Sequence, residues 1–254
     1  MTADSDEDVA RLKEIGHICA DTLQKMMKAA RAGMTTGELD DHGRRLLRAA
    51  GARSAPELAY NYPGATCISV SPVIAHGIPG KHVLEEGELI HIDVSAELNG
   101  YYADTGASMC VPPADKAETR PKPEVQKMLE ATRAALSKAL RAARAGRPLN
   151  GIGKAVQLEA KRRGFNVIYD LTGHGIGRRL HEAPGEIWNF SNPSDRRMLK
   201  TGNVLAIEPF LTTGQGRIRE MGDGWSLRTA DNALAAQFEH TIIVTHGRPL
   251  VLTV

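Results

Sequence analysis

The chain has few cysteines, few aromatic residues and almost no excess of charge. Three cysteines occur in 254 residues, Cys19, Cys67 and Cys110, and none stands in a CxxC pair. Disulfide scaffolds and zinc ribbons need cysteines paired at short spacing, so the composition argues against both and indicates a reducing compartment. The net charge is +2 and no basic stripe interleaves with aromatic residues, so we expect no nucleic-acid partner.

Long apolar runs are also missing. No segment approaches the roughly 18 consecutive apolar residues that a membrane-spanning helix requires. The first residues, MTADSDEDVA, are acidic and polar, unlike a secretory signal peptide. We therefore expect a cytoplasmic protein without membrane association.

Several catalytic motifs are absent as well. There is no GxSxG elbow, the glycines around His174 do not complete GxGxxG, and His181-Glu182 lacks the second histidine of HExxH. Cys67 or Cys110 could serve as a thiol nucleophile, but a buried structural cysteine is the simpler interpretation.

The strongest signal present is a hairpin between Leu84 and Asp104. Asn99-Gly100 favours a two-residue type I′ turn, since both residues tolerate positive φ. That turn places Asp93 opposite Gly106, so Asp93 and Asp104 share a sheet face at roughly 7–8 Å between backbones. Two inward carboxylates need a positive partner. A divalent cation, an Arg or Lys partner, and solvent exposure all remain open.

An internal repeat favours a divalent cation as the positive partner of the two aspartates. The segment 84–93 recurs at 199–208, 76–80 recurs at 181–185, and 29–33 recurs at 142–146, all in the same order. We interpret this as one domain of two similar halves, about 8–111 and 124–246, that face each other across a pseudo-two-fold axis. His76 and His181 would then be mates, as would Asp93 and Glu208.

The periodicity predicts paired helices followed by hairpins, twice. We expect helices at about 8–31, 36–50, 124–144 and 150–163, with a capping box at Thr35 and Glu38. We expect a loop at 56–63 and a charged connector at 112–123. Further strands are expected at 66–71, 73–76, 165–171, 204–211, 226–229 and 237–244. The fold class is α+β, with helices packed on a mostly antiparallel curved sheet.

More acids stand near strand ends. Glu208 precedes Pro209, Glu239 interrupts an apolar run, and His174 lies among glycines. Together with the two aspartates they form an oxygen-rich set that suits Mn, Fe or Co better than structural zinc. Two cations would share the carboxylates as bridges, whereas one would need fewer of them. The alternative is a buried ion-pair network with Arg217 or Arg219.

These residues resemble type I methionine aminopeptidase, of the M24 metallopeptidase family. The likeness covers nearly the whole chain and rests on five segments: 75–79 (AHGIP), 92–94 with Asp104-Thr105, 173–184 (GHGIGRRLHEAP), 207–209 (IEP) and 237–241 (QFEHT).

The resemblance implies a pita-bread fold and two divalent ions (Co, Mn, Fe or Zn) bound by Asp93, Asp104, His174, Glu208 and Glu239. It implies hydrolysis by a metal-bridging water or hydroxide, with Glu208, His181 and His76 as catalytic residues. His76 and His181 would also contact substrate, and Tyr62, Cys67 and Trp225 are the further pocket candidates.

The resemblance further implies removal of N-terminal methionine before a small second residue. The partners would be N-termini of nascent polypeptides, with ribosome association left open, and we expect a monomer. Leu171 and Leu180 stand where relatives often carry aromatic rings, so we expect a looser pocket. A prolidase or aminopeptidase P, and a catalytically idle partner-binding relative, remain the alternatives.

Overall fold

The structure is a computed structural model that describes residues 1–116 and 121–254. The helices of these residues are α1 (Asp6–Ala29), α2 (Thr36–Ala49), α3 (Ala55–Tyr60), α4 (Pro123–Ala142) and α5 (Asn150–Arg162). The strands are β1 (Arg53–Ser54), β2 (Cys67–Val70), β3 (Val73–Ala75), β4 (Leu89–Leu98), β5 (Tyr101–Cys110), β6 (Asn166–Val167), β7 (Thr172–Gly175), β8 (Glu182–Trp188), β9 (Val204–Ile207), β10 (Phe210–Thr212), β11 (Ile218–Glu220), β12 (Leu227–Thr229), β13 (Ala235–Gln237), β14 (His240–Ile243) and β15 (Leu250–Val251).

The four predicted helices are confirmed as α1, α2, α4 and α5. The capping box is present, because Thr35 accepts from the Glu38 amide while the Glu38 carboxylate accepts from the Thr35 amide. The predicted loop at 56–63 is wrong in its first half, where α3 forms. The Ser54 hydroxyl caps α3 by accepting from the Glu57 amide, a short-range signal too weak to predict a helix of six residues.

The second half of the chain has shorter strands than predicted. The run 204–211 breaks into β9 and β10 at Glu208-Pro209, and 237–244 breaks into β13 and β14. The strand predicted at 165–171 is limited to β6, and the glycine-rich β7, the long β8 and the short β11 were not predicted. The predicted connector at 112–123 contains residues 117–120, which lie outside the described residues, so its prediction is open there.

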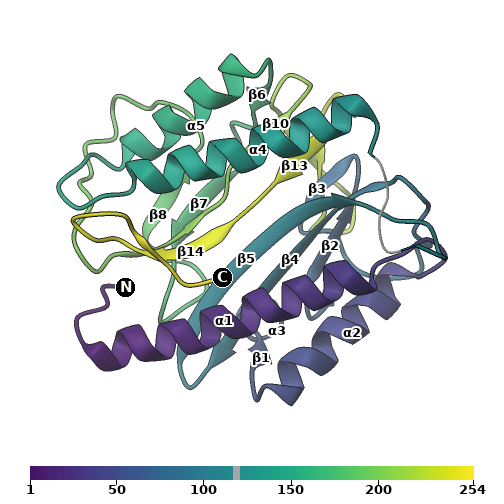
Figure 1. Ribbon diagram of the computed structural model, residues 1–254, viewed down its shortest axis with the longest axis horizontal. Helices are drawn as coiled ribbons and strands as arrows, with labels where there is room; N and C mark the ends of the chain where they lie inside the picture. Colours follow the sequence, from purple (N-terminus) through teal and green to yellow (C-terminus); the bar gives the residue numbers. More distant parts are fainter. Residues whose placement is uncertain (117–120) are drawn as a thin grey trace.

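Helices cover strands that pair antiparallel throughout (Figure 1). In the first half α1 packs on β4 and β5 and also on α2, and in the second α4 and α5 pack together, with α4 against β13. The two halves meet where β5 runs beside β14, and the Glu239 amide donates to the Gly106 carbonyl at 2.9 Å. This seam brings the carboxylates of both halves to one place.

The repeated segments make the same backbone hydrogen bonds. The Gly33 amide donates to the Leu84 carbonyl at 2.9 Å, and the Gly146 amide donates to the Leu199 carbonyl at 2.8 Å. Gly87 and Gly202, at matching places in the repeat, have φ of 81° and 84°, where glycine is favoured. The sequence repeat therefore has a counterpart in backbone conformation.

One large apolar core lies between the helices and the sheets, and a smaller cluster surrounds Ile168 and Phe210. Leu12, Ile15 and Met26 of α1 are fully buried in the large core, as the helical periodicity predicts. None of the helices in the described part of the chain is long and apolar enough to cross a membrane.

Candidate metal centre and substrate pocket

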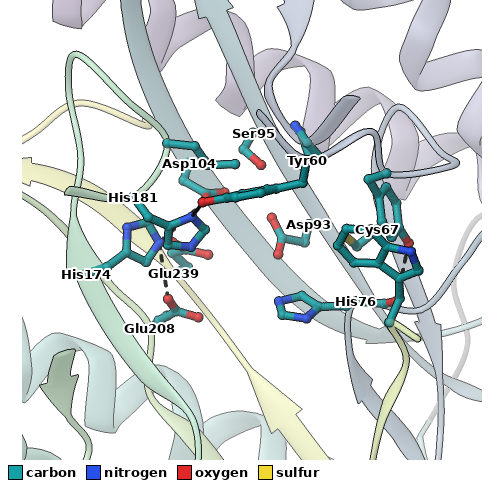
Figure 2. A pocket seen from close by; sticks show the side chains of 14 residues that line it. Tyr60, Cys67, His76, Asp93, Ser95, Asp104, His174, His181, Glu208 and Glu239 are labelled. Atoms are coloured by element: carbon teal, nitrogen blue, oxygen red, sulfur yellow. Dashed lines mark hydrogen bonds and ion pairs between the residues drawn. The ribbon is translucent and has the colours of Figure 1, made fainter. Parts of the chain in front are cut away.

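The hairpin of β4 and β5 positions the two aspartates as the turn predicts. Asn99 and Gly100 have φ of 53° and 81°, the positive values that a type I′ turn requires. Asp93 lies opposite Gly106, and Asp93 and Asp104 both line the same pocket (Figure 2). The predicted register is confirmed residue for residue.

The second half supplies the other three members of the set. His174 lies on β7, Glu208 directly follows β9, and Glu239 lies between β13 and β14. The Nε2 atom of His174 is 3.6 Å from Oε1 of Glu208 and 3.8 Å from Oδ2 of Asp104. Asp104, His174 and Glu239 each offer one atom that could bind a metal, and these three atoms all lie within 4.8 Å of one another. Residues from both halves thus converge on one point.

Several oxygens at this point have no hydrogen-bond partner. Among the described residues, Oδ1 of Asp93, Oδ1 of Asp104 and Oε1 of Glu239 are buried and unpaired. The two arginines of the alternative lie elsewhere: Arg217 pairs with Asp170 at 2.7 Å with its side chain 62% exposed, and Arg219 is exposed. Buried oxygens without donors are costly, so this donor set fits divalent cations better than an ion-pair network.

The electrostatics agree with that fit. Burial raises the pKa of Asp93, Glu208 and Glu239 well above the usual range, and repulsion from Asp104 and from one another raises these pKa values further. Burial raises the pKa of Asp104 to about 6, while hydrogen bonds from its neighbours oppose the shift. Positive charge between these groups would stabilise their ionised forms.

His174 has one defined tautomer. Its Nδ1 lies 3.0 Å from the Gly175 carbonyl oxygen, which can only accept, so Nδ1 carries the proton. Burial lowers the pKa of His174 to about 3, which keeps the ring neutral. Nε2 therefore presents a lone pair toward Asp104 and Glu208, the form in which histidine binds metals.

These residues line a cavity of about 360 Å³ (Figure 2). Its walls include the two histidines and three residues predicted for substrate contact: His76, His181, Tyr62, Cys67 and Trp225. Tyr62 and Trp225 meet edge to face with ring centroids 5.1 Å apart. Every residue predicted as a metal ligand, a catalytic residue or a substrate contact lines this pocket.

Two leucines behave differently. Leu180 lines the pocket, whereas Leu171 packs with Ile74 and Phe210 in the smaller apolar cluster. Leu171 directly precedes β7 and does not line the cavity, so the expectation that it shapes the pocket is wrong.

The cysteines are structural. Cys67 lies buried beside the carboxylates, and burial together with the Asp93 charge raises the pKa of its thiol well above the usual range. Burial also raises the pKa of Cys110. A thiol that stays protonated is a poor nucleophile, so this alternative is not supported.

The sequence did not predict three residues that line the pocket, Pro56, Tyr60 and Ser95, nor Gln237, which contacts Glu239. Ser95 lies on β4 two residues after Asp93, and Gln237 lies two residues before Glu239 and donates to it at 3.0 Å. Strand periodicity could have identified both, because residues i and i+2 share a face. Tyr60 reaches His181 across 121 residues of sequence, and no local pattern indicates that contact.

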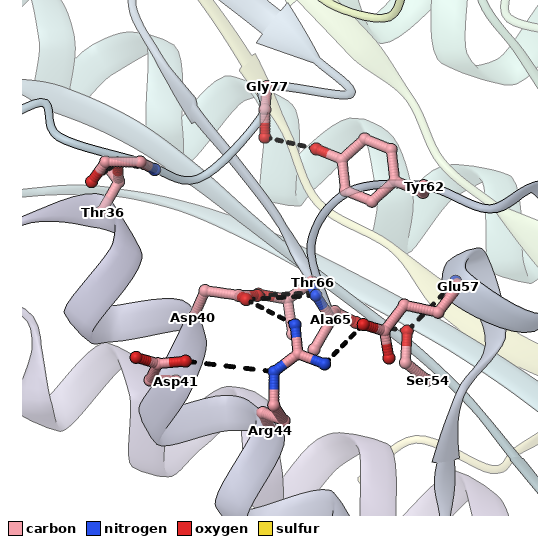
Figure 3. Close-up of polar contacts among 11 residues, drawn as sticks. Thr36, Asp40, Asp41, Arg44, Ser54, Glu57, Tyr62, Ala65, Thr66 and Gly77 are labelled. Atoms are coloured by element: carbon pink, nitrogen blue, oxygen red, sulfur yellow. Dashed lines mark hydrogen bonds and ion pairs between the residues drawn. The ribbon is translucent and has the colours of Figure 1, made fainter.

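A buried aspartate anchors the segment that carries the aromatic wall (Figure 3). Asp40 of α2 accepts from the Thr66 amide and hydroxyl, each at 2.7 Å, and from the Ala65 amide at 3.1 Å. Arg44 donates to Asp40 and also to Glu57 of α3. The network links α2 to α3 on one side, and to Ala65 and Thr66 on the other side, of the segment that holds Tyr60 and Tyr62.

We expect Asp40→Ala to lower the free energy of unfolding by about 2–4 kcal/mol, because the buried Thr66 and Ala65 donors lose their acceptor. Asp41→Ala is the matched control on the same helix. Its side chain is 66% exposed, and its Oδ1 lies 4.0 Å from Nε of Arg44, which makes a weak ion pair. We therefore expect Asp41→Ala to change the free energy of unfolding by less than about 0.5 kcal/mol. Urea unfolding measures both, and equal losses in the two variants would contradict the anchoring role.

Comparison with known proteins places these features in one family. The family model "Metallopeptidase family M24" matches residues 10–246. The chain is 44% identical over 254 residues to "Methionine aminopeptidase 2" of Bacillus subtilis, covering 100% of the chain and 99% of that protein. It is 45% identical over 253 residues to a methionine aminopeptidase of Staphylococcus epidermidis, covering 100% of the chain and 98% of that protein.

Solved structures agree. The methionine aminopeptidase of Rickettsia prowazekii matches with a TM-score of 0.92 and 31% identity over 100% of both chains. The prolidase of Pyrococcus furiosus matches with a TM-score of 0.78, covering 98% of this chain and 64% of that one, at 20% identity. The prolidase likeness shows the fold alone. The chain therefore belongs to metallopeptidase family M24, and it is an aminopeptidase of that family.

Proposed function

We propose that the chain is a type I methionine aminopeptidase that removes N-terminal methionine from polypeptides whose second residue is small. The observation that carries the proposal is the convergence of four carboxylates and His174, with unpaired buried oxygens, at one end of an apolar pocket. The relatives named methionine aminopeptidase support it.

The metal part of the proposal is a pair of divalent cations, Co, Mn, Fe or Zn, bound by Asp93, Asp104, His174, Glu208 and Glu239. When bound, such cations lower the pKa of water toward neutrality and polarise a carbonyl oxygen. The lone pair on Nε2 of His174 and the unpaired carboxylate oxygens are the support in this chain.

Three side chains are proposed as catalytic. Glu208, which lines the pocket beside the other carboxylates, takes a proton from water and passes it to the leaving amine. His76 and His181 donate hydrogen bonds to the peptide and to the tetrahedral intermediate, a stabilisation aimed at charge that develops in the reaction. Both line the cavity beside the carboxylates.

The pocket supports a preference for methionine. Tyr62, Trp225, Cys67 and Leu180 form an apolar and polarisable wall, and thioether sulfur gains from aromatic contact. The N-termini of nascent chains are the proposed substrates in a cytoplasmic setting, and the proposed state is a monomer.

Peptides that differ only at the first residue test this specificity. We expect Met-Ala-Ser and its norleucine analogue to be cleaved, with Ser, Gly or Thr also accepted at the second position. For Leu-Ala-Ser we expect a lower kcat/KM than for Met-Ala-Ser, by a factor that corresponds to only about 1–3 kcal/mol of activation free energy. The reason is that an apolar pocket discriminates weakly between side chains of similar size. A preference for acidic first residues or for Pro in the second position would overturn the proposal.

Removing metal should make stability depend on pH in a defined direction. A carboxyl whose folded pKa is raised adds stability below its unfolded pKa, and that contribution is lost as pH rises through the folded pKa. Burial raises the pKa of Asp93, Glu208 and Glu239 well above the usual range, so this loss extends to pH values well above the ordinary carboxyl pKa. The lowered pKa of His174 makes stability rise with pH, but this rise is complete above the ordinary histidine pKa of about 6.5.

We therefore expect the thermal midpoint of chelator-treated protein to fall as the pH is raised above about 6.5, where the opposing contribution of His174 is complete. Protein supplied with Mn or Co should show a smaller fall, since cations stabilise the ionised carboxylates. A midpoint of the metal-free protein that is level or rises over this range would contradict the electrostatic account.

The fold proposed is the pita-bread fold, one catalytic domain whose halves at about 8–111 and 124–246 are related by a pseudo-two-fold rotation. Matching hydrogen bonds at Gly33 and Gly146, and matching φ at Gly87 and Gly202, support the relation. Superposing the halves of an experimental structure tests it. Strands carrying Asp93 and Glu208 that a two-fold rotation cannot relate would disprove the duplication.

A further inference from the structure

Tyr60 makes the one polar side-chain contact to His181 among the described residues. Its Oη lies 2.7 Å from Nδ1 of His181, and the two rings are 5.6 Å apart between centroids. Tyr60 ends α3 in the first half of the chain, whereas His181 comes from the second half. Figure 2 shows the tyrosine reaching across the pocket to the imidazole.

The phenol is the donor in this contact. A phenol O–H is more acidic than the N–H of a neutral imidazole, so the hydrogen bond is stronger with Tyr60 donating to Nδ1. A phenol keeps its proton near neutral pH, because its ordinary pKa is about 10. A neutral imidazole that accepts at Nδ1 carries its own proton on Nε2.

The neighbouring histidine is held in the opposite tautomer. His174 donates from Nδ1 to the Gly175 carbonyl and so presents a lone pair at Nε2. The rings of His174 and His181 lie 4.0 Å apart between centroids, yet their outer partners differ. A carbonyl partner produces an acceptor that suits a cation, and a phenol partner produces a donor that suits a developing oxyanion.

We propose that Tyr60 is a positioning residue that holds His181 with its proton on Nε2, ready to donate to the substrate. The proposal rests on the role of His181 under the proposed function. It adds a residue outside the carboxylate set. It also relates the segment anchored by Asp40 to catalysis, because that segment carries Tyr60.

Kinetics of Tyr60→Phe test the coupling. The Phe variant keeps the ring and loses the hydroxyl, and one hydrogen bond to a half-exposed group predicts a fall in kcat of about fivefold with KM little changed. In His181→Ala, kcat should fall by a factor of about 10²–10³. The double variant should be no slower than His181→Ala alone, because Tyr60 acts only through that ring. Tyr169→Phe, whose ring packs against Phe190 away from the pocket, is the control with unchanged kcat.

The tautomer itself is measurable without metal or turnover. In metal-free protein with ¹⁵N-labelled histidine, long-range proton–nitrogen correlations should show His181 protonated at Nε2 and hydrogen-bonded at Nδ1. Tyr60→Phe should shift Nδ1 toward an unbonded nitrogen and mix the two tautomers, while the His174 pattern stays unchanged.

Wild-type His181 protonated at Nδ1, an unaltered spectrum in Tyr60→Phe, or additive losses in the double variant would each overturn the proposal. Failure of the loaded protein to release methionine would refute the proposed function instead. The spectrum of the metal-free protein decides the role of Tyr60 in either case.

Discussion

Glu208→Gln should reduce kcat for Met-Ala-Ser by about 10²–10⁴, the loss expected when a general base is removed. The amide keeps the shape of the side chain, but it cannot accept a proton from water near neutral pH. Glu208 lies between the end of β9 and Pro209, so its position depends on the backbone of these residues. We therefore expect the substitution to leave this backbone unchanged. KM should change much less than kcat.

The matched control is Glu130→Gln, the same chemical change on the exposed face of α4. Its turnover should equal that of the parent protein. Metal content must be measured in both variants, because Glu208 is also a proposed ligand. Near-native turnover in Glu208→Gln at full metal content would remove Glu208 from the proton-transfer role.

Asp93→Ala and Asp104→Ala should each abolish binding of a cation pair while the protein stays folded. Both aspartates lie on the paired strands β4 and β5, whose register is fixed by ten residue pairs, so the hairpin does not depend on either side chain. Without a cation the two carboxylates repel each other, so each variant should be at least as stable as the metal-free parent.

Metal analysis after dialysis, together with urea unfolding, measures this prediction. Asp41→Ala, an exposed aspartate on α2, should keep the metal content of the parent. Two ions still bound to Asp93→Ala or Asp104→Ala would refute the assignment of these residues as ligands.

The hairpin was predictable because its register depends on two adjacent residues. Asn99-Gly100 determines the turn, the turn determines the pairing, and strand alternation then places Asp93 and Asp104 on one face. Glu208 was predictable as a strand-end residue for a similarly local reason, since Pro209 has no amide proton for a sheet.

Other parts depend on contacts that no local pattern contains. The segment of β7 is rich in glycine and has weak strand propensity, and it becomes a strand because β8 and β9 pair with it on either side. Leu171 and Leu180 both resemble pocket positions in sequence, yet one packs away from the cavity. The partner of Tyr60 lies in the other half of the chain, so only the fold reveals it.

Titration of the metal-free protein with Mn or Co, while methionine release from Met-Ala-Ser is followed, tests the central claim most directly. The account predicts no release without metal and a rise in activity as cations bind. It predicts saturation once the five residues hold a pair of ions, with loss again on adding chelator. Equal release before and after chelation, or no release at any metal content, would contradict it.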